Sequence, residues 1–292
     1  MSSVHFIGGE KGGVGKSVLA RLLAQLFIER GLRFAALDAD LSHGALARYY
    51  ADYTQRVDLA QLDSADQIMD RALGADRHVL VDLPAQSHRA LQRWIAETDV
   101  LGYAREMEVP IVFWHVTDGG FDSVSHLEQL LELLGDSVQY VVAKNEGRSH
   151  DFSQFDASPA ARRLLELGGR VVTVPELDPS LMYKIDRFGS SFWAAIHTAE
   201  GERALSPMER RRAKLWLERA HAALDQVGDW QPANAPTPLA SEPRPVSVAS
   251  EPLPATVASE PQYGTVASEP QFGSVASEPR VGSAPSHDLS TN

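Results

Sequence analysis

The sequence of 292 residues contains no cysteine, and this absence excludes several kinds of chemistry. Without thiols the chain cannot form disulfides, bind metals through thiolates or use a cysteine nucleophile. Long hydrophobic runs are also missing, since no stretch approaches the roughly 18 apolar residues that indicate a membrane-spanning helix. The N-terminus leads directly into a predicted strand, without the charged and apolar regions of a secretion signal. We therefore expect a cytoplasmic protein without a membrane span.

Basic residues are outnumbered by acidic ones, with 27 Lys and Arg against 39 Asp and Glu. The formal net charge is therefore −12, of which −4 falls in residues 231–292 and −8 in the rest. An acidic body disfavours indiscriminate binding to nucleic acid. A basic cluster, Arg210 to Arg212 with Lys214, nevertheless lies near the start of a helix predicted from Ser206. Positive charge at a helix start opposes the helix dipole. Two interpretations stay open, namely a solvated helix face and a contact with DNA phosphates or another anionic surface.

Proline is sparse over most of the chain, but eleven of the seventeen prolines lie beyond Trp230. A nine-residue repeat runs there, clearest as Val-Ala-Ser-Glu-Pro starting at positions 248, 257, 266 and 275. Regular proline and low apolar content cannot support a core. We predict one folded domain over residues 1–230 and a disordered nonapeptide-repeat tail over residues 231–292. Such a tail would act as a tether or as a weak multivalent binding segment.

Short apolar runs alternate with segments of helical periodicity along residues 1–230. The predicted strands are residues 4–7, 33–37, 78–82, 111–116, 138–143 and 170–176, and the region from 178 to 227 is predicted to be helical. Helix caps are expected at Ser64, at Asp122 or Ser123, at Ser158 and at Ser206. The alternation predicts an α/β fold with a mainly parallel, doubly wound sheet and additional C-terminal helices.

The most informative segment is the glycine-rich stretch at residues 11–17, called the phosphate loop below, which joins the first predicted strand to the first predicted helix. Its glycines let backbone N–H groups wrap around a phosphate, because a side chain would block the approach. The following helix directs its N-terminal partial positive charge at the same anion. We expect Lys16 to reach the β- and γ-phosphates and the Ser17 hydroxyl to bind Mg²⁺. A glycine-rich turn that binds nothing is the alternative. The residues expected to hold the phosphates are Gly12, Gly13, Val14, Gly15, Lys16, Ser17 and Val18.

Two later strands end in acidic residues. The strand at 33–37 leads into Asp38 and Asp40, and the strand at 78–82 ends with Asp82. The carboxyl ends of parallel strands form the ligand crevice of an open α/β sheet. We expect Asp82 to hold Mg²⁺, often through water, as a Walker B acid does. Solvated loop acids are the alternative interpretation.

The phosphate loop departs from the generic pattern in two ways, since Glu10 replaces a usual glycine and Lys11 is an additional lysine. With these features residues 11–17 resemble the deviant Walker A loop of the ParA/MinD family of ATPases. The resemblance covers roughly residues 1–200 and implies a P-loop NTPase fold, with ATP and Mg²⁺ as cofactors. It also implies an ATP-dependent homodimer in which Lys11 reaches the partner's nucleotide.

The same resemblance assigns roles to residues outside the loop. It implies that Asp40 orients the attacking water and that Asp38 supports it. It further places Asn145, with Pro175 and Glu176, on the base side of the nucleotide. For Asn145 an ordinary turn asparagine is nearly as good an interpretation.

Within this family, three segments most resemble plasmid mobilisation and conjugal-transfer proteins of the MobD and TraL kind: the opening loop, residues 42–46 and residues 184–186. That resemblance implies a weak, partner-stimulated ATPase in plasmid transfer or partition, with a protein partner from the transfer machinery and with DNA as a possible ligand. An alternative is a nucleotide-gated interaction module with little or no turnover. It is favoured by two departures from the family pattern, residues 41–43 in the first switch and Gln86 in the second.

Overall fold

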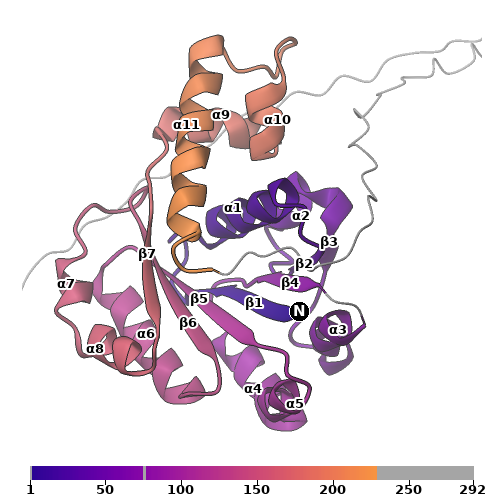
Figure 1. The fold of residues 1–292 in the computed structure, drawn as a ribbon, viewed down its shortest axis with the longest axis vertical. Helices are drawn as coiled ribbons and strands as arrows, with labels where there is room; N and C mark the ends of the chain where they lie inside the picture. The colour runs from indigo at the N-terminus through magenta and orange to yellow at the C-terminus, as the bar shows by residue number, and fades with distance from the viewer. Residues whose placement is uncertain (1, 75–76, 229–292) are drawn as a thin grey trace, which may run out of the picture. The chain divides into compact units, whose positions relative to one another are not determined.

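The computed structural model describes residues 2–74 and 77–228 (Figure 1). These residues contain a seven-stranded sheet with the strand order β3-β2-β4-β1-β5-β6-β7. All six pairs of neighbouring strands are parallel. The predicted parallel α/β fold is therefore confirmed, whereas the repeat tail predicted over residues 231–292 lies outside the described residues.

The strands are β1 (Ser3–Gly8), β2 (Phe34–Asp38), β3 (Thr54–Arg56), β4 (His78–Asp82), β5 (Ile111–Thr117), β6 (Gln139–Asn145) and β7 (Arg170–Val174). The helices are α1 (Lys16–Glu29), α2 (Ala45–Tyr49), a short 3-10 helix (Ala51–Tyr53), α3 (Leu62–Leu73), α4 (His88–Thr98), α5 (Val100–Glu106), α6 (Phe121–Leu134), α7 (Ser153–Asp156), α8 (Pro159–Glu166), α9 (Pro179–Arg187), α10 (Phe192–His197) and α11 (Pro207–Leu224).

Helices cover both faces of the sheet and form two hydrophobic cores (Figure 1). One core joins the sheet to α1, α2, α9, α10 and α11, and the other joins it to α3 to α8. Successive strand residues point to opposite faces, so Phe6 of β1 enters the second core and Ile7 enters the first. Burial on both faces explains why the central strands β1, β4 and β5 are nearly continuous apolar runs.

The strand order places the phosphate loop, which follows β1, at the middle of the sheet. Strand β1 lies between β4 and β5, where the chain order changes direction. In open α/β sheets the ligand crevice forms outside the carboxyl ends of the strands at such a point. The parallel register also sets Asp38 of β2 beside Asp82 of β4. The phosphate loop and both strand-end acids thus meet at one edge.

Two of the predicted helix caps are confirmed. The Ser158 hydroxyl accepts a hydrogen bond from the Ala161 N–H, with 3.0 Å between N and O. Ser206 forms a capping box with Glu209 at the start of α11. Both sites combine a serine with proline at the next position, so two independent signals mark the same helix start.

The other predicted caps are wrong, and the Ser64 and Ser123 hydroxyls instead bind groups in the loops that precede their helices. Ser64 lies inside α3, and its hydroxyl accepts from the Asp58 N–H at 2.8 Å. Helix α6 begins after Gly120, not after Asp122 or Ser123. The Ser123 hydroxyl instead donates to Asp118 at 2.6 Å.

Two surface features bear on the expected partners. None of the helices in residues 2–74 and 77–228 is long and apolar enough to span a membrane. On α11 the side chains of Arg211, Arg212 and Lys214 are exposed, with the Lys214 Nζ 4.0 Å from Glu218 Oε1. This exposure is compatible with both interpretations of the basic cluster.

Candidate functional site

The loop between β1 and α1 has the backbone form that its glycines predict. Gly13 and Gly15 take φ values of 76° and 107°, in the region that favours glycine. A β-carbon on Gly15 would lie 2.2 Å from the Asn145 Nδ2, so only glycine fits there. Gly15 is also the N-cap residue of α1 and supplies no capping side chain. The first N–H groups of α1 therefore face the crevice without a side-chain partner at the cap.

Lys16 is buried at the base of this loop. Its ammonium group donates to the Lys11 carbonyl, with 3.1 Å between Nζ and O. Burial lowers the pKa of Lys16, and the nearby carboxylates of Asp82, Glu10 and Asp40 act in the opposite direction. The Lys16 ammonium group thus lies between the loop carbonyl that it contacts and the nearby carboxylates.

Asp82 is fully buried at the end of β4, and neither carboxylate oxygen has a hydrogen-bond partner among the described residues. Burial, and secondarily the neighbouring Asp38, raises its pKa to about 7. Lys16 and the Ser17 side chain lie close enough to act against this rise. A buried carboxylate without donors is costly unless a cation faces it.

This arrangement fits a magnesium ion bound together with phosphates. The described residues contain no group of three or more His, Asp or Glu that could hold a metal. Mg²⁺ is instead commonly held by one or two protein oxygens, several waters and substrate phosphates. The uncompensated Asp82 oxygens and the adjacent Ser17 hydroxyl supply that donor set.

Asp38 and Asp40 organise the loop after β2. The Asp38 carboxylate accepts from the N–H groups of Asp40 at 3.1 Å and Ala47 at 2.8 Å. Asp40 accepts from the Ser42 hydroxyl at 2.6 Å and from the Ser42 and His43 N–H groups. Although burial raises the pKa of Asp40, these hydrogen bonds together hold it below its usual range. In this structure Asp40 therefore remains ionised and closes its own turn.

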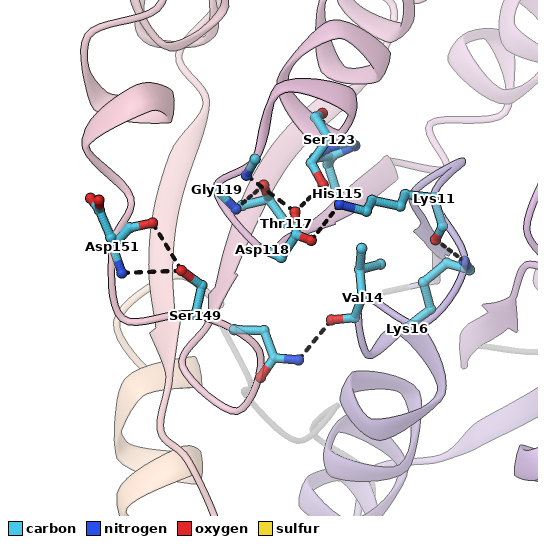
Figure 2. Close-up of polar contacts among 12 residues, drawn as sticks. Lys11, Val14, Lys16, His115, Thr117, Asp118, Gly119, Ser123, Ser149 and Asp151 are labelled. Carbon is cyan, nitrogen blue, oxygen red and sulfur yellow. Dashed lines mark hydrogen bonds and ion pairs between the residues drawn. The ribbon is translucent and has the colours of Figure 1, made fainter.

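Lys11 extends from the phosphate loop towards the loop that follows β5 (Figure 2). Its ammonium group contacts the Asp118 carboxylate, with 2.7 Å between Nζ and Oδ2. The hydrogen bond from Lys11 lowers the pKa of Asp118, although burial acts the other way. The lysine expected to reach a second subunit is thus paired within its own chain.

Glu10 links the phosphate loop to the segment after β4. Its carboxylate accepts from the His88 N–H, the first of α4, with 2.8 Å between Oε1 and N. An acid at a helix N-terminus satisfies a free donor and complements the helix dipole. The segment between Asp82 and α4 includes Gln86, which has a φ of 60°. A residue other than glycine is uncommon in that region, and Gln86 stands where the family usually has glycine.

The residues assigned to the base side lie on neighbouring strand ends. Asn145 of β6 is paired in register with Val174 of β7, and Pro175 and Glu176 follow directly. The Asn145 amide donates to the Val14 carbonyl in the phosphate loop at 2.7 Å. Glu176 contacts His150 at 3.0 Å, and the Pro175 carbonyl accepts from Trp216. The structure brings these residues together, and base recognition by them stays a prediction.

The contact of Asn145 with the loop leads to a prediction for Asn145→Ala. The substitution leaves the Val14 carbonyl without its side-chain donor, which typically costs about 1–3 kcal/mol when the group is buried. We expect a lower free energy of unfolding and a nucleotide affinity about tenfold weaker, since the loop is less fixed. Denaturant unfolding and nucleotide titration measure the two effects. Unchanged values for both would contradict a positioning role of Asn145.

Sequence reasoning missed two residues of this site, Glu10 as a helix cap and Asp118 as the partner of Lys11. A signal existed for Asp118, because it follows a buried strand as Asp38 and Asp82 do. For Glu10 the only signal was its departure from the glycine of the generic loop. Neither contact partner could be chosen from the sequence, since they lie 107 and 78 positions away.

Comparison with known proteins gives three kinds of match. A model of the CobQ/CobB/MinD/ParA nucleotide binding domain matches residues 5–207. Protein TraL of Escherichia coli is 25% identical over 247 residues, which cover 78% of this chain and 99% of TraL. Protein MobD of Acidithiobacillus ferrooxidans is 26% identical over 222 residues, which cover 74% of this chain and 96% of MobD. The solved MinC:MinD cell division protein complex of Aquifex aeolicus aligns with a TM-score of 0.46 and 14% identity, covering 74% of this chain and 95% of that chain.

Proposed function

The chain belongs to the CobQ/CobB/MinD/ParA nucleotide-binding family, and from this premise we propose that it is an Mg²⁺-dependent ATPase that switches between monomer and dimer. In this proposal two copies associate around ATP and separate after slow, partner-stimulated hydrolysis. The observation that carries the proposal is the meeting of the phosphate loop, the buried Lys16 and the uncompensated Asp82 at one edge of the sheet.

The proposed roles follow from the positions of these groups. The loop N–H groups and Lys16 bind the phosphates, while the Ser17 hydroxyl and Asp82 hold Mg²⁺, which neutralises phosphate charge when bound. Asp40, which is held ionised, accepts a hydrogen bond from the attacking water and so orients it. Release of Asp40 from its turn with Ser42 is required first, because its oxygens already accept hydrogen bonds there.

The cargo is proposed from the relatives. The similarity to proteins TraL and MobD extends over nearly their whole lengths. Together with the resemblance of the opening loop to plasmid-transfer proteins, it supports a role in plasmid mobilisation or conjugal transfer. The proposed partner is then a protein of the transfer machinery, and the exposed basic residues of α11 are where DNA would bind.

The experiment that tests the dimer switch is the substitution Lys11→Ala. We expect this variant to bind ATP with nearly wild-type affinity, since Lys16 and the loop backbone are unchanged. It should not form ATP-dependent dimers, because the lysine that would contact the partner's nucleotide is missing. Sedimentation velocity with and without Mg²⁺ and ATP measures the dimer fraction. Dimers of the variant at wild-type ATP and protein concentrations would refute the cross-subunit role.

A specific observation favours the second candidate, a nucleotide-gated module without turnover. The Asp40 carboxylate accepts hydrogen bonds from Ser42 and His43 and so closes the turn at residues 41–43. While it makes these hydrogen bonds, Asp40 does not orient an attacking water. Phosphate release measured with and without plasmid DNA separates the two candidates. Turnover under either condition supports the ATPase, whereas nucleotide-dependent dimers with no phosphate release in any condition support the module.

A further inference from the structure

The contact between Lys11 and Asp118 is more organised than an ordinary surface ion pair. The Asp118 side chain is 20% exposed, and that of Lys11 is 35% exposed. The second Asp118 oxygen accepts from the Ser123 hydroxyl at 2.6 Å and from the Gly120 N–H at 3.2 Å. Figure 2 shows Lys11 and Ser123 converging on the Asp118 carboxylate. The carboxylate is therefore also held by its own loop, through contacts that do not involve Lys11.

The backbone directly after Asp118 takes a bent form that requires glycine. Gly119 has a φ of 79°, and a β-carbon there would lie 2.7 Å from the Asp151 carbonyl. The Gly119 N–H donates to the Thr117 hydroxyl at 3.0 Å. The loop after β5 is thus bent so that Asp118 points at the phosphate loop, where Lys11 meets it (Figure 2).

We propose that Asp118 is a positioning residue that holds Lys11 on its own subunit and so opposes nucleotide-dependent self-association. This inference rests on the proposed function, in which Lys11 contacts the nucleotide of the second copy. For that contact the ammonium group leaves a preorganised carboxylate. Each copy in a dimer breaks one such pair, so the cost is counted twice.

The cost is modest because both side chains are partly exposed to water. Pairs of this kind typically change an equilibrium constant by roughly threefold. Two pairs per dimer then change the dimerisation constant about tenfold. Asp118 thus raises the nucleotide concentration at which dimers form. It does so through Lys11 and does not contact the nucleotide.

The test is the substitution Asp118→Asn in the full chain, which keeps the side-chain shape but removes the charge. We expect dimerisation in Mg²⁺ and ATP to become about tenfold tighter by sedimentation. In the Lys11→Met background, which lacks the lysine that the dimer needs, the same substitution should not restore dimers. Asp122→Asn is the matched control, since Asp122 acts on Lys11 only through its charge at a distance. An unchanged or weaker dimer of Asp118→Asn, where the wild type dimerises, would overturn the inference.

A second measurement separates this inference from the proposed function. In nucleotide-free protein at pH 8, Asp118→Asn should increase the labelling of Lys11 by an amine-reactive acylating reagent several-fold, read by mass spectrometry. Asp122→Asn should change it little. If labelling increases but the wild type never dimerises in ATP, the dimer switch fails while the hold on Lys11 stands. If labelling does not increase, Asp118 does not hold Lys11 and the inference is wrong.

Discussion

Replacing Lys16 with alanine should weaken ATP binding by about a hundredfold or more. Lys16 is the buried cation at the base of the phosphate loop, next to Asp82 and Asp40. A charge-assisted hydrogen bond typically contributes about 1.5–3 kcal/mol, and leaving phosphate charge beside two acids without this cation adds repulsion. Since about 1.4 kcal/mol is tenfold in affinity, the lost hydrogen bond alone accounts for about ten- to hundredfold, and the repulsion brings the expected loss to about a hundredfold or more. Calorimetric titration with Mg²⁺ and ATP measures it directly.

The controls for this result separate charge from folding. Lys16→Met keeps most of the buried stem and should lose affinity to nearly the same extent, because only the ammonium group is removed. Lys214→Ala removes an exposed lysine of α11 and should leave affinity unchanged. Circular dichroism verifies that each variant is folded. Affinity of Lys16→Ala within threefold of wild type would contradict the assignment of this loop.

The phosphate loop could be predicted from the sequence because several local signals agree there. An apolar strand, closely spaced glycines and a helix of regular periodicity all fall within residues 4–30. The acids after the second and third predicted strands could also be placed, because parallel strands bring their carboxyl ends to the same edge. Fold class and the position of the crevice follow from such short-range patterns.

The parts that could not be predicted depend on contacts between distant segments. Strand β3 has three residues, of which Gln55 and Arg56 are exposed, so it lacks the apolar pattern of a buried strand. The in-chain partner of Lys11 is likewise fixed only when β1 and β5 pair. Local pattern identified the groups, and tertiary structure decided their partners.

Electrostatics explains why this site is arranged around Asp82. Asp38 and Asp82 are both fully buried and lie side by side in the register of β2 and β4. The Asp38 oxygens accept two backbone hydrogen bonds, whereas the Asp82 oxygens have none within the described residues. Asp82 is thus the buried acid whose negative charge would gain most from a bound cation.

Replacing Asp82 with asparagine should stabilise the ligand-free protein while removing its response to Mg²⁺. The folded pKa of Asp82 is raised to about 7 from 3.8. Its charge therefore penalises folding fully above about pH 7, and the penalty fades as pH falls towards 4. A difference of about 3 pH units corresponds to roughly 4 kcal/mol. The unpaired amide offsets part of this gain, so we expect the variant to be about 2 kcal/mol more stable at pH 8 and equal to wild type or less stable near pH 4.

Denaturant unfolding of both proteins at several pH values isolates this contribution. Buried His5 and His115, with pKa values lowered to about 3 and 4, destabilise the fold as pH falls. They act alike in both proteins and cancel in the difference. In Mg²⁺ and ADP the order should reverse, because only the wild type offers the metal a carboxylate. Asp52→Asn, on an exposed residue, should match wild type throughout. A ligand-free variant less stable than wild type at pH 8 would contradict the raised pKa of Asp82. Equal Mg²⁺ dependence of nucleotide affinity in the two proteins would show that Asp82 is not the acid that holds the metal.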